Sequence, residues 1–554
     1  MADTNRTKMM RRWSALQNER SSWLSHWKEI SDNLLPRSGR FFLSDRNKGE
    51  KRHNAIYDSS GTMALRILGA GLMAGATSPA RPWHRLTTSD PELDESAAVK
   101  QWLSDVRDQQ IAIFARSNTY RALHTMYEEL GAFGTGASII VPHFKNVIHH
   151  HAQTAGQYCI AENAEGQVNT IYRETSMSVV QLVREFGYQK CSETVRRMFD
   201  AGNLDAFVPI YHAIEPRADR DLSKRDDVNM PFRSCYFEAG GNGDDTLRES
   251  GYKEFIAICP RWAVSGGDVY GHSPAMEALG DIKQLQHEQK RKAQGIDYQT
   301  NPPLQAPTSA KSAGINRLPG GITYVDPANP NGGVRTAFET NLNLNYLLED
   351  IRDVRDRIRS VFHADMFLMI SSANKNGMTA TEVAERHEEK LLMIGPTLER
   401  LHNEMLAPLI EMTFARQIEA GTVPPPPPEI EGKELSIEFV SMLAQAQKAV
   451  ATNSIDRFVG NLGAVAQYKP DVLDKFDSDK WADRYADALG IDPELIVPGE
   501  QVALIRQARA QQMAQQQQNE QAAQAADAAA KLGRVNTSQP NLLTDATAAF
   551  SGYN

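Results

Sequence analysis

The chain has 554 residues, of which 41% are apolar and 23% charged, and its formal net charge is −9. This length and composition are typical of a globular protein that buries its own core, so disulfides or structural metals are not needed to hold it together. The excess of acidic residues argues against a protein that coats nucleic acid through bulk positive charge.

The cysteines and the apolar segments argue against a zinc ribbon, a signal peptide and a membrane-spanning segment. The four cysteines are scattered, with no CxxC pair, which indicates a reducing compartment and no zinc ribbon. The polar, basic stretch 1–13 has no apolar centre, so we expect no signal peptide there. No window approaches about 20 uninterrupted apolar residues, which predicts that no segment spans a membrane.

Four helices are predicted in the first part of the chain, from apolar and small residues that recur at three- and four-residue spacing. Pro36 and Gly39 are expected to end the first of them, and Gly134 the fourth. The expected ranges are 13–34, 58–76, about 97–115 and about 119–133.

Residues 140–270 are expected to be rich in β-structure, because short apolar stretches alternate there with clusters of Gly, Asn and Asp. The run 138–141 predicts a strand just before them, and 240–245 predict a turn. One helix, near 178–186, is predicted to interrupt the strands.

Two helices are predicted around an irregular insertion in the middle of the chain. The first opens at Ser273-Pro274, with proline near N1, and is expected to reach about 296. Prolines and glycines exclude a single helix over 301–338, which we expect to form a compact loop-and-strand insertion. The second helix is predicted at about 344–362, where Asp353 and Arg357 form a supporting i,i+4 pair.

Residues 366–378 are predicted to interrupt helical structure. A capping box at Thr379 and Glu382 then predicts a long helix to about 420. Pro396 and Pro408 lie inside that helix and are expected to bend it.

A proline run at 424–428 predicts a stiff extended linker after the long helix. One strand is expected at 435–440, followed by several short helices to about 489. The Ala- and Gln-rich segment 501–532 predicts a further helix with little apolar surface.

A glycine pattern offers one enzyme hypothesis. Gly69-Ala-Gly71-Leu-Met-Ala-Gly75 is a GxGxxxG variant, and Asp90 follows about twenty residues later, as in dinucleotide-binding proteins. That hypothesis needs a strand before Gly69, whereas the preceding residues continue a helical pattern. We favour a helix whose small residues let another backbone approach closely.

Other catalytic and metal patterns are weak. The run 149–151, His-His-His, could bind metal, but adjacent strand side chains point to opposite faces, so a polar loop is favoured. The sequence contains no HExxH, Walker A or GxSxG motif, so we expect no metal, no cofactor and no enzyme activity.

Two basic groups on the predicted central helices, and one lysine after them, are candidates for binding. Lys290-Arg291-Lys292 lies near the predicted end of its helix, where compensation of the helix dipole is an equally good explanation. Arg352, Arg355 and Arg359 repeat at helical spacing, although a solvated face shared with Asp350, Asp353 and Asp356 also explains them. Lys375 is the only charged residue in 366–378.

The order of these parts resembles the head-to-tail connector, or portal, proteins of short-tailed bacteriophages. The resemblance rests on several short stretches in sequence order and spans 13–532. These stretches are Pro82-Trp83, Tyr270-Gly-His-Ser-Pro274, Ala278-Leu279, Asp281-Ile-Lys283, Leu285, Asn301-Pro-Pro303 and Gly377-Met-Thr-Ala-Thr-Glu-Val383.

The resemblance implies an α+β, mainly α, portal fold assembled as a ring, usually of twelve subunits. It implies a wing at 1–270 and 379–440, stem helices at 271–300 and 344–365, a clip at 301–343 and a channel loop at 366–378. It also implies a crown at 441–500, a C-terminal barrel helix at 501–532 and a disordered tail at 533–554. The channel candidates are Asn374, Lys375, Asn376, Lys290, Arg291, Lys292, Arg352, Arg355 and Arg359, and the clip docking candidates are Lys311, Arg317 and Arg335.

As implied partners, the resemblance gives double-stranded DNA passing through the ring without sequence specificity, the terminase large subunit, capsid and scaffolding proteins, and tail adaptor and tail proteins. The expected location is the portal vertex of the virion, and the host cytoplasm during assembly. A mostly acidic ring would repel phosphate, which suits passage of DNA rather than static binding. A nucleotide-cofactor enzyme and a non-portal virion scaffold protein stay open as alternatives.

Overall fold

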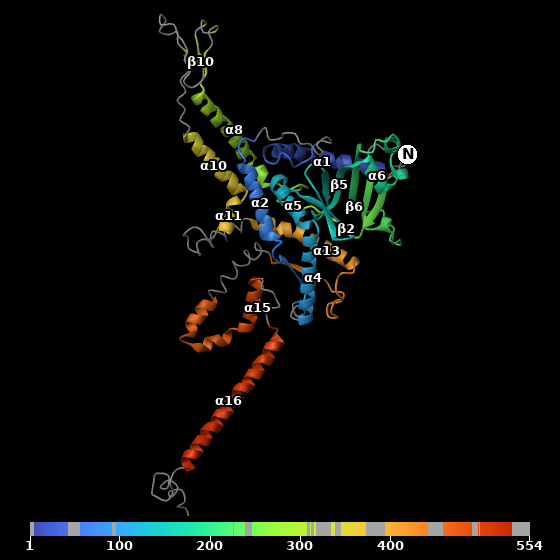
Figure 1. Cartoon of the computed structure of the whole chain (residues 1–554). Coiled ribbons are helices and arrows are strands. Elements are labelled where there is room, and N and C mark those ends of the chain that lie inside the picture. The colour runs from blue at the N-terminus through green and yellow to red at the C-terminus, as the bar shows by residue number, and fades with distance from the viewer. Residues whose placement is uncertain are drawn as a thin grey trace, which may run out of the picture. The chain divides into compact units, whose positions relative to one another are not determined.

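The computed structural model describes most of the chain and shows two compact units. The described residues are 5–41, 56–90, 93, 96–224, 226–238, 246–306, 308, 311, 315–316, 334–337, 345–372, 394–433, 435–440, 458–489, 497 and 499–533. One unit comprises Met1–Ser89 with Gln101–Ala451, and the other Asp90–Lys100 with Thr452–Asn554. Helices and antiparallel sheets both occur, which confirms a mixed fold (Figure 1).

All four predicted N-terminal helices are present. They are α1 (Asn5–Asn33), α2 (Ser60–Ala76), α4 (Ala97–Arg116) and α5 (Thr119–Phe133). Gly134 ends α5 in the left-handed conformation, with φ of 75°, where a Cβ atom would also collide with the carbonyl oxygen of Gly271. Glycine is therefore required there, both by conformation and by the close approach of a second backbone.

The β-rich region forms two antiparallel sheets. The three-stranded sheet has the order β3-β2-β9 and the five-stranded sheet the order β4-β5-β6-β7-β8. The strands are β2 (Ala137–His143), β3 (Val147–Gln153), β4 (Tyr158–Glu162), β5 (Val168–Ser178), β6 (Phe207–Pro216), β7 (Phe232–Glu238), β8 (Arg248–Tyr252) and β9 (Ala257–Ile258).

Two α-helices interrupt these strands in the described part of the region, whereas the sequence predicted one. The predicted helix is α6 (Val179–Phe186), and the additional one is α7 (Glu193–Asp200). The Ser192 side chain caps α7 by accepting a hydrogen bond from the Val195 backbone. With eight residues, α7 is too short to be predicted from periodicity, and it is stabilised by its apolar contact with the sheet.

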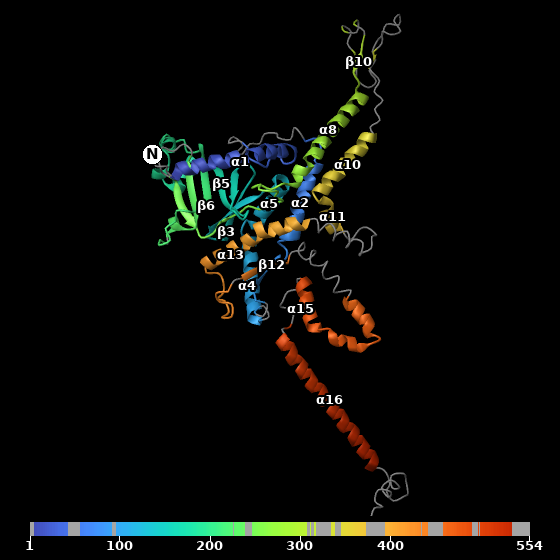
Figure 2. The same cartoon turned by 180° about the vertical axis from the view of Figure 1, so that it is seen from behind.

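Each face of the five-stranded sheet has its own apolar cluster. On one face, Trp13 of α1 packs against Tyr172 and Tyr211. On the other, Leu182 of α6 and Val195 of α7 belong to a second buried cluster. Figures 1 and 2 show α1 lying along the sheet, on the face that contains the Trp13 cluster.

The middle of the chain follows the predicted order. It contains α8 (Pro274–Thr300), the short antiparallel strands β10 (Leu304–Gln305) and β11 (Arg335–Thr336), α10 (Asn345–Val361) and α11 (Ala364–Ser372). Ser273 caps α8 and Pro274 occupies its first turn, as predicted. Most of the insertion 301–338 lies outside the described residues.

The predicted break at 366 is wrong, because α11 stays helical to Ser372. The reason is tertiary packing, since Phe367 is buried against α2 at Gly71. A Cβ atom on Gly71 would overlap the Phe367 ring, so the glycine creates the space that this aromatic ring fills. Residues 373–378 lie outside the described residues.

The C-terminal part of the predicted long helix is described from Ile394 and is not regular. A π-helical turn (His402–Leu406) precedes α13 (Ala407–Glu419), and the Ala407 N–H donates to the carbonyl oxygen of His402. Pro408 follows at once, and a proline removes one backbone donor and crowds the preceding turn, so the wider turn accommodates it. Beyond α13, the predicted strand is β12 (Leu435–Phe439), which pairs with β1 (His84–Thr88).

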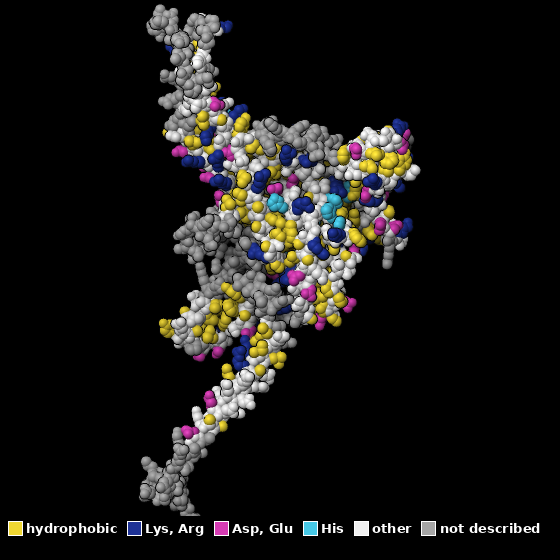
Figure 3. Space-filling model, viewed as in Figure 1, with side chains coloured by type: hydrophobic (Ala, Val, Ile, Leu, Met, Phe, Trp, Pro, Cys, Tyr) yellow, Lys and Arg dark blue, Asp and Glu magenta, His cyan; other side chains and the backbone are white. Residues whose placement is uncertain are grey.

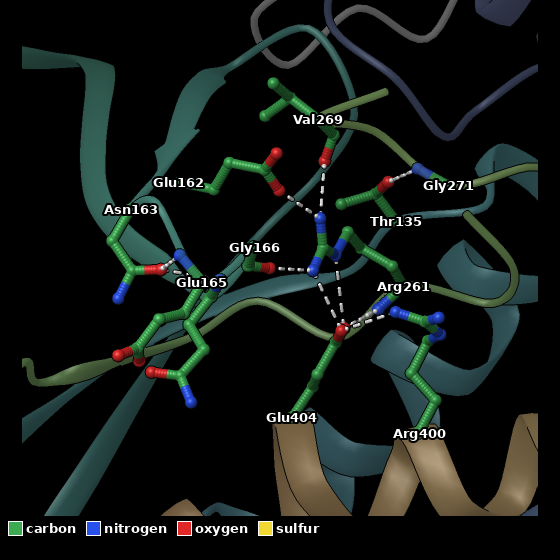
Figure 4. A network of polar contacts seen from close by, with 11 residues as sticks. Thr135, Glu162, Asn163, Glu165, Gly166, Arg261, Val269, Gly271, Arg400 and Glu404 are labelled. Atoms are coloured by element: carbon green, nitrogen blue, oxygen red, sulfur yellow. Dashed lines mark hydrogen bonds and ion pairs between the residues drawn. The ribbon is translucent and has the colours of Figure 1, made fainter. Parts of the chain in front are cut away.

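The π-helical turn presents Glu404 to a buried arginine (Figure 4). Arg261 is 2% exposed. Its backbone N–H and its Nε both donate to Glu404 Oε2, at 2.8 and 3.3 Å, and its Nη2 donates to Glu404 Oε1 at 2.9 Å. Its other donors reach Glu162 Oε2 at 2.8 Å and the carbonyl oxygens of Val269 at 3.3 Å and Gly166 at 2.6 Å.

This arrangement uses all five N–H groups of the guanidinium. Burial alone would lower the pKa of Arg261, but the hydrogen bonds and charges of Glu404 and Glu162 raise it above its usual value. The Arg261 contacts therefore fasten the helical segment that contains Glu404 to the β4–β5 turn and to the chain before α8.

The second unit has its own described helices. They are η5 (Pro470–Lys475), α15 (Ser478–Leu489) and α16 (Gly499–Gly533), together with a helical stretch at 458–466. Arg506 of α16 donates to both carboxylate oxygens of Asp479 in α15, at 2.6 and 2.7 Å. The predicted helix 501–532 is confirmed by α16. The predicted turn at 240–245 lies outside the described residues, as does the predicted tail 533–554 apart from Gly533, which ends α16.

The described part of the first unit also contains two short 3-10 helices, η2 (Tyr188–Lys190) and η3 (Asp227–Asn229). Two isolated β-bridges pair Thr135 with Arg261 and Ala263 with His272. Among the described helices, none combines the length and apolar character that a membrane crossing requires.

Replacing Arg261 by Ala should lower the free energy of unfolding by about 3–5 kcal/mol, because Glu404 and Glu162 would lose their buried cationic partner. Urea unfolding followed by circular dichroism measures this. The matched control is Arg197→Ala, which breaks an exposed ion pair with Glu193 and should cost less than about 1 kcal/mol. Equal losses in the two variants would contradict the assignment of Arg261 as a buried anchor.

Candidate functional site

The candidate site is the antiparallel helix pair formed by α8 and α10. Figures 1 and 2 both show these helices side by side, with β10 and β11 at their far end. Ile282 and Leu285 of α8 are buried, as are Ile351, Val354 and Ile358, which recur at helical spacing in α10. Apolar residues at helical spacing therefore form the buried contact between α8 and α10, and the polar faces of the two helices stay exposed.

A buried aspartate fastens the base of this pair to the chain before α2. Asp58 Oδ2 accepts hydrogen bonds from Arg355 Nη2 at 2.6 Å and from Gln289 Nε2 at 2.9 Å. Gln286 Oε1 accepts from the backbone N–H groups of Tyr57 and Asp58, at 2.6 and 2.8 Å. One short segment thus contacts both α8 and α10.

The environment of Asp58 favours its charged form. Burial raises the pKa of Asp58, but hydrogen bonds from Ser60 and from Arg355 outweigh burial and hold this pKa below its usual value. The Ser60 backbone N–H donates to Asp58 Oδ1 at 2.8 Å, at the start of α2. The Arg355 partner of Asp58 lies 297 positions later in the chain, so this contact was not predictable from sequence.

The three arginines predicted on α10 have different surroundings. Arg352 is exposed, and Arg359 is half exposed and lies 3.5 Å from Asp356. Arg355 instead points to Asp58. The predicted pair of Asp353 and Arg357 is present, and Arg357 also donates to Asp281 of α8 at 3.1 Å. The aspartates predicted to share this face therefore do contact some of the cations.

The basic run Lys290-Arg291-Lys292 lies inside α8, because the helix continues to Thr300. Compensation of the helix dipole does not explain these residues, since that effect fades within the last turn. Lys290 and Arg291 are exposed, and Arg291 Nε donates to His287 Nε2 at 3.4 Å. Figure 3 shows Lys and Arg side chains mixed with acidic ones along the two helices.

The remaining predicted site residues are only partly described. Lys311 is exposed, and Arg335 is exposed on β11. Arg317 and the loop residues Asn374, Lys375 and Asn376 lie outside the described residues.

The histidine run does not form a polar loop as expected, but belongs to β3. His150 is buried, whereas its neighbours His149 and His151 are on the opposite face, as strand alternation requires. Within the described part of the chain, no group of three or more His, Cys, Asp or Glu side chains could hold a metal ion.

The dinucleotide hypothesis is wrong. Gly69, Gly71 and Gly75 all lie within α2, and the residues directly before Gly69 belong to the same helix rather than to a strand. A Cβ atom on Gly69 would lie 3.1 Å from the Glu128 side chain of α5, and Gly71 faces Phe367 of α11. The small residues therefore serve close helix packing rather than cofactor binding.

Known proteins are similar to this chain over nearly its whole length. Residues 6–497 match the family described as bacteriophage head to tail connecting protein. The chain is 66% identical over 550 residues to a probable portal protein of Bordetella phage BPP-1, covering 99% of each chain. It is 43% identical over 545 residues to the portal protein of Salmonella phage epsilon15, covering 98% of each.

One solved structure, a chain of the virion of a native gene transfer agent particle, is similar over 73% of this chain and 90% of its own, at 12% identity and a TM-score of 0.31. The family and both relatives are described as connecting or portal proteins, and none of them is described as an enzyme. Near-complete coverage at high identity leaves one conclusion: the chain belongs to the family of bacteriophage head to tail connecting proteins and functions as a portal protein, the connector between phage head and tail.

Proposed function

We propose that about twelve copies of the chain form a closed ring at one capsid vertex, with α8 and α10 of each copy around a channel for double-stranded DNA. The observation that supports this most directly is the antiparallel helix pair, which is fastened to its own subunit at Asp58 and keeps exposed charges along its polar faces. A closed ring repeats one heterologous interface, and paired helices can line a pore without leaving backbone groups unpaired.

In this proposal the exposed cations guide DNA through its phosphates. Lys290 and Arg291 on α8, with the partly exposed Lys292, and Arg352 and Arg359 on α10 would make contacts that do not depend on base sequence. The acidic residues between them and the net charge of −9 would prevent tight static binding. Such a surface suits DNA that moves during packaging and ejection.

Arg355 has a different part in the proposal. Its guanidinium is held by Asp58, so it would position α10 within the subunit while its neighbours on the helix face the channel. The loop residues Asn374, Lys375 and Asn376 would reach toward the DNA from the end of α11.

The outer parts of the subunit would bind other proteins. The clip, 301–343, would dock the terminase large subunit during packaging and tail adaptor proteins afterwards, with Lys311, Arg317 and Arg335 as candidate contacts. The wing, at 1–270 and 379–440, and the crown, at 441–500 with a barrel helix at 501–532, would contact capsid and scaffolding proteins. Assembly would take place in the host cytoplasm, before the ring becomes part of the virion.

Negative-stain images of the purified protein should show rings with a central hole, and class averages should give the number of subunits. A protein that stays monomeric both in solution and in capsid fractions would contradict the ring. A scaffold protein without closed symmetry, the remaining alternative, would give no such class averages.

Deleting 373–376 should leave ring assembly intact and reduce the amount of DNA that capsids package or retain. The deletion starts after α11, so the packing of Phe367 against α2 is preserved. DNase-protected DNA per capsid, measured by quantitative PCR, tests the prediction. Normal DNA content with intact rings would remove this loop from the mechanism.

Replacing Lys290, Arg291 and Lys292 together by Gln should lower the packaged DNA several-fold, because phosphate contacts along α8 are lost. The control is the pair Arg196→Gln with Arg197→Gln on α7, which removes exposed or partly exposed charge away from the helix pair. Unchanged packaging in the α8 variant, with rings still visible, would show that these cations do not guide DNA.

A further inference from the structure

A group of histidine and arginine side chains lies on β3, β5 and α5, away from the α8–α10 pair. His149 and His151 share one face of β3, and their ring centroids are 5.1 Å apart. His143 of β2 is 5.7 Å from His149 by the same measure. Figure 3 shows that histidine side chains on this face of the molecule have Lys and Arg side chains around them.

Arg173 is the buried member of this group. It is 8% exposed, and its Nε donates to His212 Nδ1 at 3.2 Å while its Nη2 donates to the Tyr236 hydroxyl at 3.4 Å. His212 is buried as well, with its Nε2 at 3.0 Å from Ser234 Oγ. Both acceptors of Arg173 are therefore uncharged groups.

Buried guanidinium groups normally pair with carboxylates, because an uncompensated buried charge is costly. Arg261 meets this requirement with two glutamates. Among the described residues Arg173 has no ion pair, so its charge is compensated by no group of this subunit that the structure describes.

The surroundings of the histidines are cationic too. Burial and then the charge of Arg173 lower the pKa of His151 to about 4. Burial, followed by His143 and Arg121, lowers the pKa of His149. Burial, followed by the charges of Arg173, Arg248 and His151, also lowers the pKa of His212. In none of these cases does a carboxylate act in the opposite direction.

Four side chains of this group lie near enough for their charges to interact, because Arg121 acts on His149 and Arg173 acts on His151, and the two histidine rings are neighbours. We call them the basic cluster: Arg121, His149, His151 and Arg173. We propose that the basic cluster binds a phosphate group. An arginine offers paired donors that match phosphate oxygens, and an imidazole that gains a proton beside the anion adds a charge-assisted hydrogen bond.

A phosphate fits this cluster better than a metal cation does. The arginines would repel a cation, and the described residues contain no metal-binding group of His, Cys, Asp or Glu. A phosphate monoester or inorganic phosphate has between one and two negative charges at pH 7, enough to offset the buried Arg173 and to favour imidazolium. The source of the group is either free phosphate or the backbone of nucleic acid.

Titration of inorganic phosphate against the full-length protein, followed by 31P NMR line broadening at constant ionic strength, tests the proposal. We expect saturable broadening in the unaltered protein and at least about tenfold weaker binding in Arg121→Gln and in His151→Gln, since each loses one charged hydrogen bond. Both side chains are exposed, so these variants should fold normally. Arg197→Gln, an exposed change on α7, is the control and should bind phosphate as the unaltered protein does.

A short DNA duplex without terminal phosphates distinguishes the two sources. Displacement of inorganic phosphate by the duplex supports the nucleic-acid backbone as ligand, and saturable phosphate binding without displacement supports free phosphate. Broadening that does not saturate, or that is equal in the unaltered protein, Arg121→Gln and His151→Gln, overturns the proposal. The result is independent of ring formation and of DNA passage through the ring.

Discussion

The buried charge of Arg261 is the constraint around which the described part of the first unit is built. A guanidinium removed from water must have all its donors satisfied, and here they are satisfied by stretches far apart in the chain, at 162–166, 269 and 404. Because the acceptors belong to the β4–β5 turn, the chain before α8 and the π-helical turn, the position of each stretch determines the positions of the others.

The helix pair takes its position from this region. Ser273 caps α8 while its hydroxyl donates to the carbonyl oxygen of Ala132 in α5, so the start of α8 is fixed on the neighbouring helix. Asp58 then holds Arg355 of α10, and Phe367 of α11 fills the space at Gly71 of α2. The pair is thus fastened at its base by its own subunit, and its polar faces stay exposed. In the proposed ring these faces would meet DNA or neighbouring copies.

Two buried arginines show how context decides the role of a charge. Arg261 is enclosed by two carboxylates and serves packing, whereas Arg173 bonds to neutral groups beside histidines and has no carboxylate partner among the residues that the structure describes. The sequence contains nothing that separates them, since both follow short apolar runs in the β-rich region. The difference arises from partners that are tens or hundreds of residues away.

The sequence by itself determined the order of the helices and strands, the caps at Ser273 and Gly134, the apolar stripe of α10 and the resemblance to portal proteins, because these depend on periodicity and on neighbouring residues. Tertiary structure decided the helical state of 366–372, the short helix α7, the π-helical turn at Glu404 and the pairing of Arg355 with Asp58. Each of these is stabilised by a contact distant in the chain, and such contacts leave no local pattern to detect.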